Sequence, residues 1–292
     1  MTSPRIALTV IGDEIGPSLN EMLPFCALNG VTRLDMRTVS GRNLLGMSLG
    51  EVAEIAGKID DAGIRVPTFV SPMLKWAAPD HEVTHGQVNF AFDPASCPVE
   101  DVLEYGCDVA GVLGATKMRI FSFLRHDGFQ PEDLLQTLER LMDLSGMHVT
   151  EMHLENTPVC NLGSIAELAD FFRQLPEMLA IVHDARILPI LPLLDISNSY
   201  RMGRPPIDAD IAILAPHVKN IHLKDSHDGK TVPFGDGKIP WAKELERLLK
   251  DVRVPEVVAS IETHCPQNAR EATARSIEGL RRISREVGIE VV

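Results

Sequence analysis

The sequence predicts a closed barrel of eight parallel strands, each followed by a helix, in one domain. Short apolar runs and longer amphipathic runs alternate eight times along the 292 residues, the pattern of repeated strand–helix units. An open, doubly wound sheet is disfavoured because no Gly-x-Gly-x-x-Gly segment opens the first strand–helix turn. No linker interrupts the series, and chains of about 250 residues commonly form one barrel. We therefore expect a single α/β domain of the (β/α)8 barrel type over residues 1–292.

The apolar runs define the expected strands. Each is short and rich in leucine or β-branched residues, and most do not alternate with polar residues, as is typical of strands buried on both faces. They are residues 5–11, 32–39, 64–70, 116–123, 148–155, 187–195, 217–223 and 257–262. The longest irregular stretch, residues 71–98, follows the third run. Because barrel active sites lie at the carboxyl ends of the strands, we expect this loop to lie over the barrel mouth.

Two of the helices are predicted most clearly. Residues 131–146 form one, with leucines on a single face and Gly146 just past the end. Residues 268–288 form the last helix of the chain. Pro131 and Pro240 suit first helical turns, where no N–H group is needed.

Composition restricts the class of protein. The net charge of −13 and the pI near 5.2 disfavour binding to nucleic acid, because the chain as a whole repels polyphosphate. Five widely spaced cysteines without a Cys-x-x-Cys pair argue against a disulfide framework or a thiolate zinc site. Residues 1–17 fit neither a signal peptide nor a membrane span. We expect a protein of the reducing cytoplasm that has no membrane partner.

Four consecutive strands end in ionisable residues: Glu155, Asp195, His222 and Glu262. Parallel strands bring these side chains to one rim, where three crowded carboxylates would repel each other unless a cation lay between them. Three carboxylates and one imidazole form a hard donor set that suits Mn²⁺, Mg²⁺ or Co²⁺. Taken singly, each has a simpler interpretation: Asp195 could cap the next helix, Glu155 could pair with a lysine, and His222 could be a buried histidine with its own partners.

Further side chains should face the same cavity. Residues two apart on a strand share a face, so His153, Lys224 and His264 are expected beside the four rim residues. Arg119 on the fourth strand is a candidate substrate contact, although it could instead pair with a buried carboxylate. Trp76 in the long loop could form an apolar wall beside the substrate or simply pack within the loop.

Several segments resemble the xylose isomerase-like TIM-barrel superfamily of sugar and sugar-phosphate isomerases and epimerases. The most specific are HLEN (153–156), LLDISNSY (193–200), HLKD (222–225) and SIETH (260–264). VPFGDGKIPW (232–241) is similar to the family's turn after the seventh strand, and Asp225 is expected to be a turn or cap residue beside it.

The resemblance implies one divalent metal ion, most simply Mn²⁺ with Mg²⁺, Co²⁺ or Zn²⁺ as alternatives, held by Glu155, Asp195, His222 and Glu262. It implies that Glu155 and Glu262 are the catalytic acid–base pair, moving a proton through a metal-stabilised enediolate of a sugar, keto sugar or sugar phosphate. Return of the proton to the opposite face gives an epimer, and return to the neighbouring carbon gives an isomer. Lys224, His264, Asn198, Arg119 and Trp76 would contact this small-molecule substrate.

The sequence departs from the free-ketose 3-epimerases of the superfamily at three positions. Asn198, Asn161 and Asp228 stand where those enzymes carry a histidine, an acid and an arginine. The expected substrate is therefore a modified, phosphorylated or oxidised sugar.

Other functions remain open. A metal-dependent lyase or dehydratase acting on a keto sugar or inosose would use the same residues. A non-catalytic sugar-binding barrel is a further alternative. Apurinic endonuclease activity, also found in this superfamily, is disfavoured by Asn198 and by the negative charge. Many relatives form dimers or tetramers, so a homo-oligomer is expected, with Phe90 and Phe92 able to seal a neighbour's site.

Overall fold

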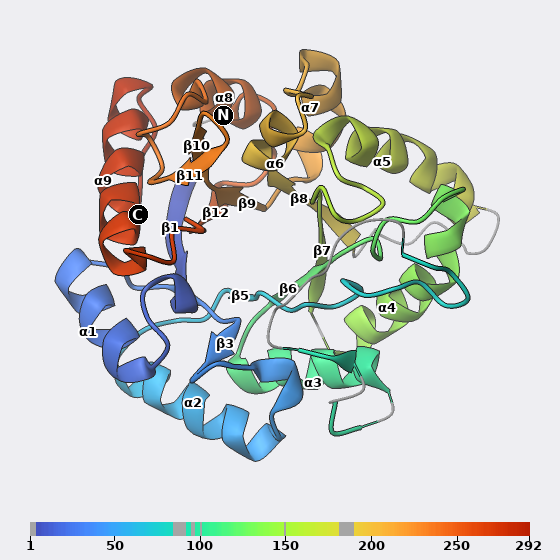
Figure 1. Ribbon diagram of the computed structural model, residues 1–292, viewed down its shortest axis with the longest axis horizontal. Coiled ribbons are helices and arrows are strands. Elements are labelled where there is room, and N and C mark those ends of the chain that lie inside the picture. Colours follow the sequence, from blue (N-terminus) through green and yellow to red (C-terminus); the bar gives the residue numbers. More distant parts are fainter. Residues whose placement is uncertain (1–3, 84–91, 95–96, 100, 149, 181–189) are drawn as a thin grey trace.

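The computed structural model describes residues 4–83, 92–94, 97–99, 101–148, 150–180 and 190–292. Eight parallel strands form one sheet in the order β2-β1-β12-β9-β8-β7-β6-β5. Two parallel bridges, Arg33 to Arg65 and Met36 to Phe69, join its outer strands β2 and β5. The sheet thus nearly closes into a barrel with helices around it, which confirms the predicted (β/α)8 fold (Figure 1).

The barrel strands are β1 (Arg5–Ile11), β2 (Leu34–Asp35), β5 (Thr68–Phe69), β6 (Lys117–Ile120), β7 (Glu151–Glu155), β8 (Ile190–Asp195), β9 (Asn220–Leu223) and β12 (Glu256–Ile261). The α-helices are α1 (Leu19–Asn29), α2 (Leu49–Asp61), α3 (Val102–Leu113), α4 (Leu135–His148), α5 (Ile165–Ala180), α6 (Ile196–Arg201), α7 (Asp208–Leu214), α8 (Trp241–Leu249) and α9 (Ala269–Glu286). Short 3-10 turns cover Gly12–Glu14, Leu44–Gly46, Pro131–Leu134 and Ala215–His217. No helix in the described ranges is both long and apolar enough to span a bilayer.

Two antiparallel hairpins at the carboxyl ends of strands were not predicted. The expected strand over 32–39 is wrong in its second half, where the chain leaves the barrel and forms β3 (Thr38–Val39) with β4 (Arg42–Asn43). Ser40 and Gly41 between them have φ of 53° and 75°, the left-handed conformation that two-residue hairpin turns require. Asp228 and Gly229 form the second two-residue turn, between β10 (Asp225–His227) and β11 (Lys230–Val232). Their φ angles of 49° and 77° are also left-handed.

The other boundaries differ by smaller amounts. The third strand is only Thr68–Phe69, and the sixth begins at Ile190, while residues 187–189 of its predicted range lie outside the described residues. The prediction that a helix stops before Gly146 is wrong: α4 runs on to His148, with Gly146 and Met147 exposed in its last turn.

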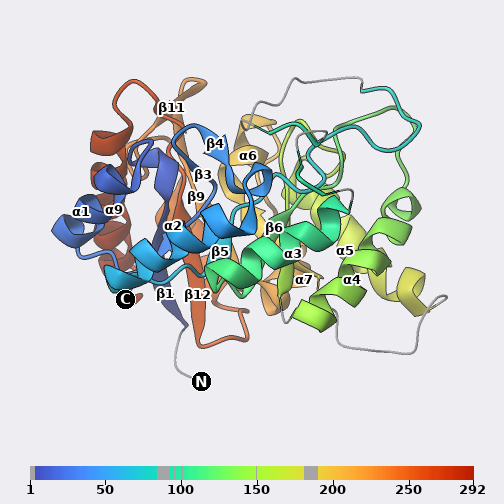
Figure 2. The ribbon, with the colours of Figure 1, turned by 90° about the horizontal axis from the view of Figure 1, so that it is seen from below.

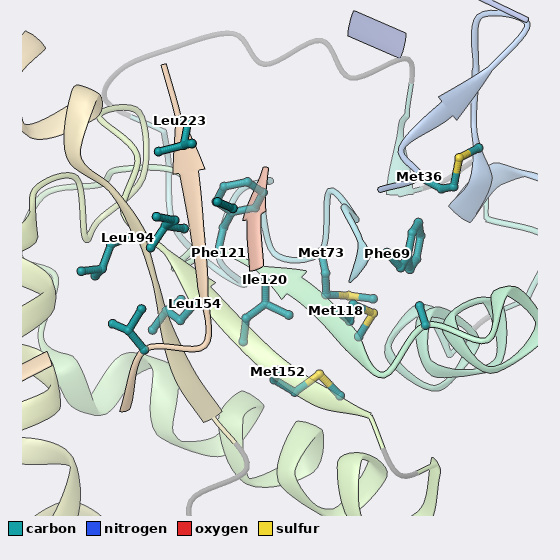
Figure 3. Packing of buried hydrophobic residues seen from close by; sticks show 14 of the residues in the cluster. Met36, Phe69, Met73, Met118, Ile120, Phe121, Met152, Leu154, Leu194 and Leu223 are labelled. Carbon is teal, nitrogen blue, oxygen red and sulfur yellow. The ribbon is translucent and has the colours of Figure 1, made fainter. Parts of the chain in front are cut away.

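On most barrel strands the outward side chains are apolar, and many of the inward side chains are polar. Met118, Ile120, Met152 and Leu154 belong to the shell between strands and helices (Figure 3). The inward face is polar, and its groups bond across the barrel: Asn220 on β9 donates to Thr68 on β5 at 3.2 Å, and Ser260 on β12 donates to Asp35 on β2 at 2.5 Å. The strands therefore carry a polar column that leads to the rim.

The described parts of the 71–98 loop lie at the same end of the barrel as hairpin β10–β11 (Figure 2). The start of the loop follows the segment after β6, because Phe121 N–H donates to Met73 C=O at 2.9 Å and Leu124 N–H donates to Trp76 C=O at 2.8 Å. Residues 84–91 and 95–96 of this loop lie outside the described residues, and Phe90 is among them.

Candidate metal centre and active site

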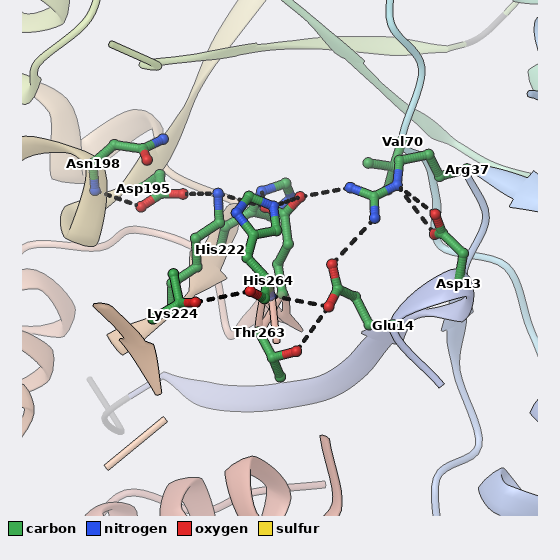
Figure 4. Close-up of polar contacts among 12 residues, drawn as sticks. Asp13, Glu14, Arg37, Val70, Asp195, Asn198, His222, Lys224, Thr263 and His264 are labelled. Carbon is green, nitrogen blue, oxygen red and sulfur yellow. Dashed lines mark hydrogen bonds and ion pairs between the residues drawn. The ribbon is translucent and has the colours of Figure 1, made fainter. Parts of the chain in front are cut away.

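The four predicted rim residues come together at the carboxyl end of the barrel. Glu155 and Asp195 are the last residues of β7 and β8, His222 lies in β9, and Glu262 directly follows β12. One ligand atom from each lies within 4.8 Å of the others, and all four side chains are buried. Figure 4 shows Asp195 and His222 facing this centre.

The donor atoms fit a divalent cation. Asp195 Oδ2, Glu262 Oε2 and His222 Nδ1 are buried, and within the described residues their closest polar contacts are with one another and with the Lys224 ammonium. His222 Nδ1 lies 3.1 Å from Glu262 Oε2 and 3.5 Å from Glu155 Oε1. Buried acceptors that converge in this way need a cation, and carboxylate oxygens with one imidazole nitrogen are donors that hard divalent ions accept.

Asp195 is held by two asparagines. The Asn156 side chain accepts from Asp195 N–H and donates to Asp195 C=O, both at 2.9 Å. Asp195 Oδ1 accepts from Asn198 N–H at 2.9 Å and caps α6. Asp195 thus caps the next helix with one oxygen and presents the other to the centre. The Asn198 side chain donates to Asn156 C=O at 2.9 Å, so its expected contact with substrate stays a prediction.

Arg119 and Lys224 lie within the cluster and pair with its carboxylates. Arg119 Nη1 is 3.1 Å from Glu155 Oε2 and 3.8 Å from Glu262 Oε1. Lys224 Nζ is 2.6 Å from Asp195 Oδ2, 2.7 Å from Glu262 Oε2 and 3.9 Å from Glu155 Oε1. Both side chains are almost fully buried, so these are close ion pairs inside the protein.

Sequence reasoning missed Arg37, which lies after β2. Its Nη1 is 2.8 Å from Glu262 Oε1, its Nη2 is 3.1 Å from Glu14 Oε1, and its Nε is 3.0 Å from Asp13 Oδ2 (Figure 4). Glu14 also accepts from Thr263 Oγ1 at 2.7 Å. The sequence held a sign of this ion-pair network. Asp13 and Glu14 come just after the first strand, as the other rim acids lie at the ends of theirs, and two more acids at the rim call for a further cation.

Lys75 was also missed. Its Nζ lies 4.4 Å from the centroid of the Phe121 ring, and the Arg119 guanidinium lies 4.7 Å from the same centroid. Burial lowers the pKa of Lys75 to about 8, although the negative charge of Glu155 acts in the opposite direction. A basic group with a pKa near neutrality therefore lies close to the rim.

The remaining candidates lie at different depths. His264 Nε2 is 3.1 Å from Glu262 Oε1, and 37% of the His264 side chain is exposed, which places it at the mouth. His153 shares the inward face but lies deeper, 3.4 Å from Glu151 Oε2. Trp76 is half-buried, with its ring 6.2 Å from that of Phe92, so a contact with substrate stays a prediction.

The surrounding charges favour the ionised forms of Glu155, Glu262 and His222. Burial alone would raise the pKa values of Glu155 and Glu262, but the neighbouring cations, among them His222 for Glu155 and Lys224 for Glu262, hold both below the ordinary range. Burial raises the pKa of Asp195. Burial would lower the pKa of His222, but Glu155 and Glu262 raise it to about 9. His222 must therefore release its proton when it ligates a metal.

Asp225 and two of the departures from the family pattern, Asn161 and Asp228, have contacts within the local fold. The Asp225 carboxylate accepts from Ser226 N–H at 2.8 Å, Gly235 N–H at 3.1 Å and Gly237 N–H at 3.0 Å, so it organises the 232–241 turn as predicted. The Asn161 side chain donates to Ser122 C=O at 2.8 Å. Asp228 is exposed at the hairpin tip and pairs with Lys238.

A family profile described as xylose isomerase-like TIM barrel matches residues 25–283. The chain therefore belongs to the xylose isomerase-like TIM-barrel family, as the sequence segments predicted. Comparison of the sequence with curated proteins gave no match.

Solved structures share the fold at low identity. The IOLI protein with a bound zinc atom is 15% identical, with a TM-score of 0.68 over 97% of this chain and 98% of that one. The probable 3-DHS dehydratase AsbF of Bacillus anthracis is 14% identical, with a TM-score of 0.66 over 95% and 98%. The 3-keto-D-glucoside 4-epimerase YcjR of E. coli is 11% identical, with a TM-score of 0.62 over 97% and 99%. The chain spans 43% of a xylose isomerase-like TIM barrel/4-hydroxyphenylpyruvate dioxygenase fusion protein that it also matches.

Proposed function

We propose that the protein is a metal-dependent isomerase or epimerase of a sugar, keto sugar or sugar phosphate. The observation that carries the proposal is the convergence of Glu155, Asp195, His222 and Glu262 within 4.8 Å at one rim. A divalent ion bound there, Mn²⁺ in the simplest case, would supply the Lewis acidity that weakens a C–H bond beside a carbonyl group.

Glu155 and Glu262 are the proposed acid–base pair. Their strands, β7 and β12, are the outer two of the four adjacent strands that carry the proposed ligands, so the two carboxylates flank the set. Arg119 contacts one oxygen of Glu155, while Arg37 and His264 contact one oxygen of Glu262. These cations would keep both glutamates ionised, as a proton acceptor requires, and would fix the direction of the second oxygen of each.

A lyase or dehydratase is the second candidate, and Lys75 favours it. An elimination needs a group that can protonate the departing hydroxyl, and an ammonium with a pKa of about 8 near Glu155 suits that task. The similarity in fold to the probable dehydratase AsbF supports this candidate only at the level of the barrel.

Proton exchange with solvent tests both candidates together. The chelator-treated protein is reloaded with Mn²⁺, Mg²⁺, Co²⁺ or Zn²⁺ and incubated in D₂O with free, phosphorylated and oxidised keto sugars. Isomerisation, epimerisation and elimination all begin by removing a proton beside the carbonyl, so loss of that proton's NMR signal reports any of them. A product that differs from its substrate only by the deuterium it has taken up then identifies an isomerase or epimerase, and loss of water with new ultraviolet absorbance identifies a dehydratase.

The control for Glu262 is a glutamate at the other end of its own strand. Glu262→Gln and Glu155→Gln should abolish exchange, whereas Glu256→Gln, at the opposite end of β12 and 31% exposed, should retain it. A wild-type protein that binds about one metal ion per chain but exchanges no proton would be a binding barrel instead. Absence of metal binding would overturn the proposal itself.

A further inference from the structure

We infer that Lys224 is an internal competitor of the metal ion: its ammonium holds two of the ligand oxygens, and metal binding releases it toward the substrate. The inference rests on the proposed metal-dependent function and adds a role for one residue of the chain.

The ammonium and a metal ion need the same atoms. Lys224 Nζ lies 2.6 Å from Asp195 Oδ2 and 2.7 Å from Glu262 Oε2. Both oxygens are buried, and Glu262 Oε2 also lies 3.1 Å from His222 Nδ1, so they face the ligand cluster. A divalent ion binds carboxylate oxygen at roughly 2.0–2.2 Å, so both cations on the same two oxygens would be buried side by side. Like charges at that separation repel strongly in a buried site.

Lys224 is the cation that can move. Arg119 is also fixed by Ser71 C=O at 3.1 Å and Val70 C=O at 3.3 Å, and Arg37 is fixed by Asp13 and Glu14. Within the described residues, the polar contacts of the Lys224 side chain are all with the three ligand carboxylates. Its four-carbon stem is flexible, whereas a guanidinium with several partners is held in place.

The released ammonium needs a new anionic partner. A metal ion would take the Asp195 and Glu262 oxygens that Lys224 contacts, and Lys224 would stay buried beside the reacting centre. A buried cation that has lost its partners favours a negatively charged oxygen of the substrate, either a fixed carboxylate or phosphate or the oxygen that gains charge during proton removal.

Metal affinity of the Lys224→Gln variant tests the inference. Glutamine keeps a similar length and removes the charge, so Mn²⁺ should bind at least about tenfold more tightly than to the wild-type protein in calorimetry at one fixed pH. Lys224→Arg, which keeps the charge, should not show this gain. Lys238→Gln is the matched control, because Lys238 is 61% exposed in the same segment of the chain and pairs with Asp228. Its affinity for Mn²⁺ should equal that of the wild type.

A second measurement on the wild-type protein does not depend on the variant folding. Amine-reactive labelling of Lys224, followed by mass spectrometry, should increase severalfold when Mn²⁺ is added, because the ammonium leaves its two carboxylates. Labelling of Lys238 should not change and serves as the internal reference.

The outcomes separate this inference from the proposed function. Equal or weaker Mn²⁺ binding by Lys224→Gln, or labelling of Lys224 that does not rise with Mn²⁺, overturns the inference alone when the wild type binds metal. Binding by the variant but not by the wild type overturns the proposed function, and with it the release of Lys224 by a bound metal ion. Absence of binding to either protein overturns the inference and the proposed function together.

Discussion

Replacing Asp35 by asparagine should remove a specific pH dependence of stability. Asp35 is fully buried in the barrel interior, where its carboxylate accepts from Thr68 N–H at 3.1 Å and from Ser260 Oγ at 2.5 Å. Burial raises the pKa of Asp35 to about 6 from its ordinary value of 3.8, although Ser260 and His222 act to lower it. Asparagine has the same shape and can keep a partner on each side, so its main effect is to remove the buried charge.

The raised pKa of Asp35 decides whether stability rises or falls with pH. Between about pH 4 and pH 6 the folded protein binds a proton at Asp35 that the unfolded chain has released, so the contribution of Asp35 to stability falls as pH rises. The difference between a pKa of about 6 and 3.8 corresponds to a total change of about 3 kcal/mol in the free energy of unfolding. About 2 kcal/mol of this change falls between about pH 7 and about pH 4.5.

Urea unfolding of both proteins across this range measures the effect. The Asp35→Asn variant should be at least as stable as the wild type at about pH 7, and the wild type should gain about 2 kcal/mol relative to it by about pH 4.5. Dilute protein is needed because the pI of about 5.2 lies inside the window. A stability difference that does not change with pH would refute the reasoning, because it would mean that Asp35 titrates equally in the folded and unfolded chains.

Two further predictions concern the supports of the site. Gly237→Ala should lower the free energy of unfolding by about 2–4 kcal/mol in urea, because a Cβ there would lie 2.0 Å from Asp225 Oδ1 and break the turn. Gly57→Ala, whose Cβ would meet no atom within 4 Å, should not destabilise, and equal losses in the two variants would contradict this account. Asn156→Ala should weaken Mn²⁺ binding by about 10–100-fold in calorimetry, because it removes both bonds that fix the backbone of Asp195. Unchanged affinity would show that Asp195 is positioned without Asn156.

The barrel and the ligand set could be predicted because each rests on a repeated local pattern. Buried parallel strands give continuous apolar runs, and a carboxylate or imidazole at the end of such a run is visible in the sequence, as at Glu155 and His222. The hairpin over 38–43 was missed because Thr38 and Val39 continue an apolar run, and only Ser40-Gly41 marks the turn. Asp228-Gly229 is a stronger hairpin signal of the same kind that was not used.

The partners of the ligands could not be predicted, because long side chains reach across the barrel. Arg37 and Glu262 are 225 positions apart and meet at 2.8 Å, and no spacing rule connects them. The same reach explains how one rim can hold so many charges. Arg37 pairs with Asp13 and Glu14 as well as Glu262, so two of its three carboxylate partners lie outside the ligand set.

Arg119 and Lys224 are then left to balance the three ligand carboxylates, and only Arg119 also bonds to backbone carbonyl groups. A barrel that needed three carboxylates only to bind metal could have placed apolar residues at positions 119 and 224, since a buried ion pair is often no more stable than a well-packed apolar pair. Two buried cations there instead agree with the inference that Lys224 changes partners: it pairs with the carboxylates before a metal ion binds, and with a negatively charged oxygen of the proposed substrate afterwards.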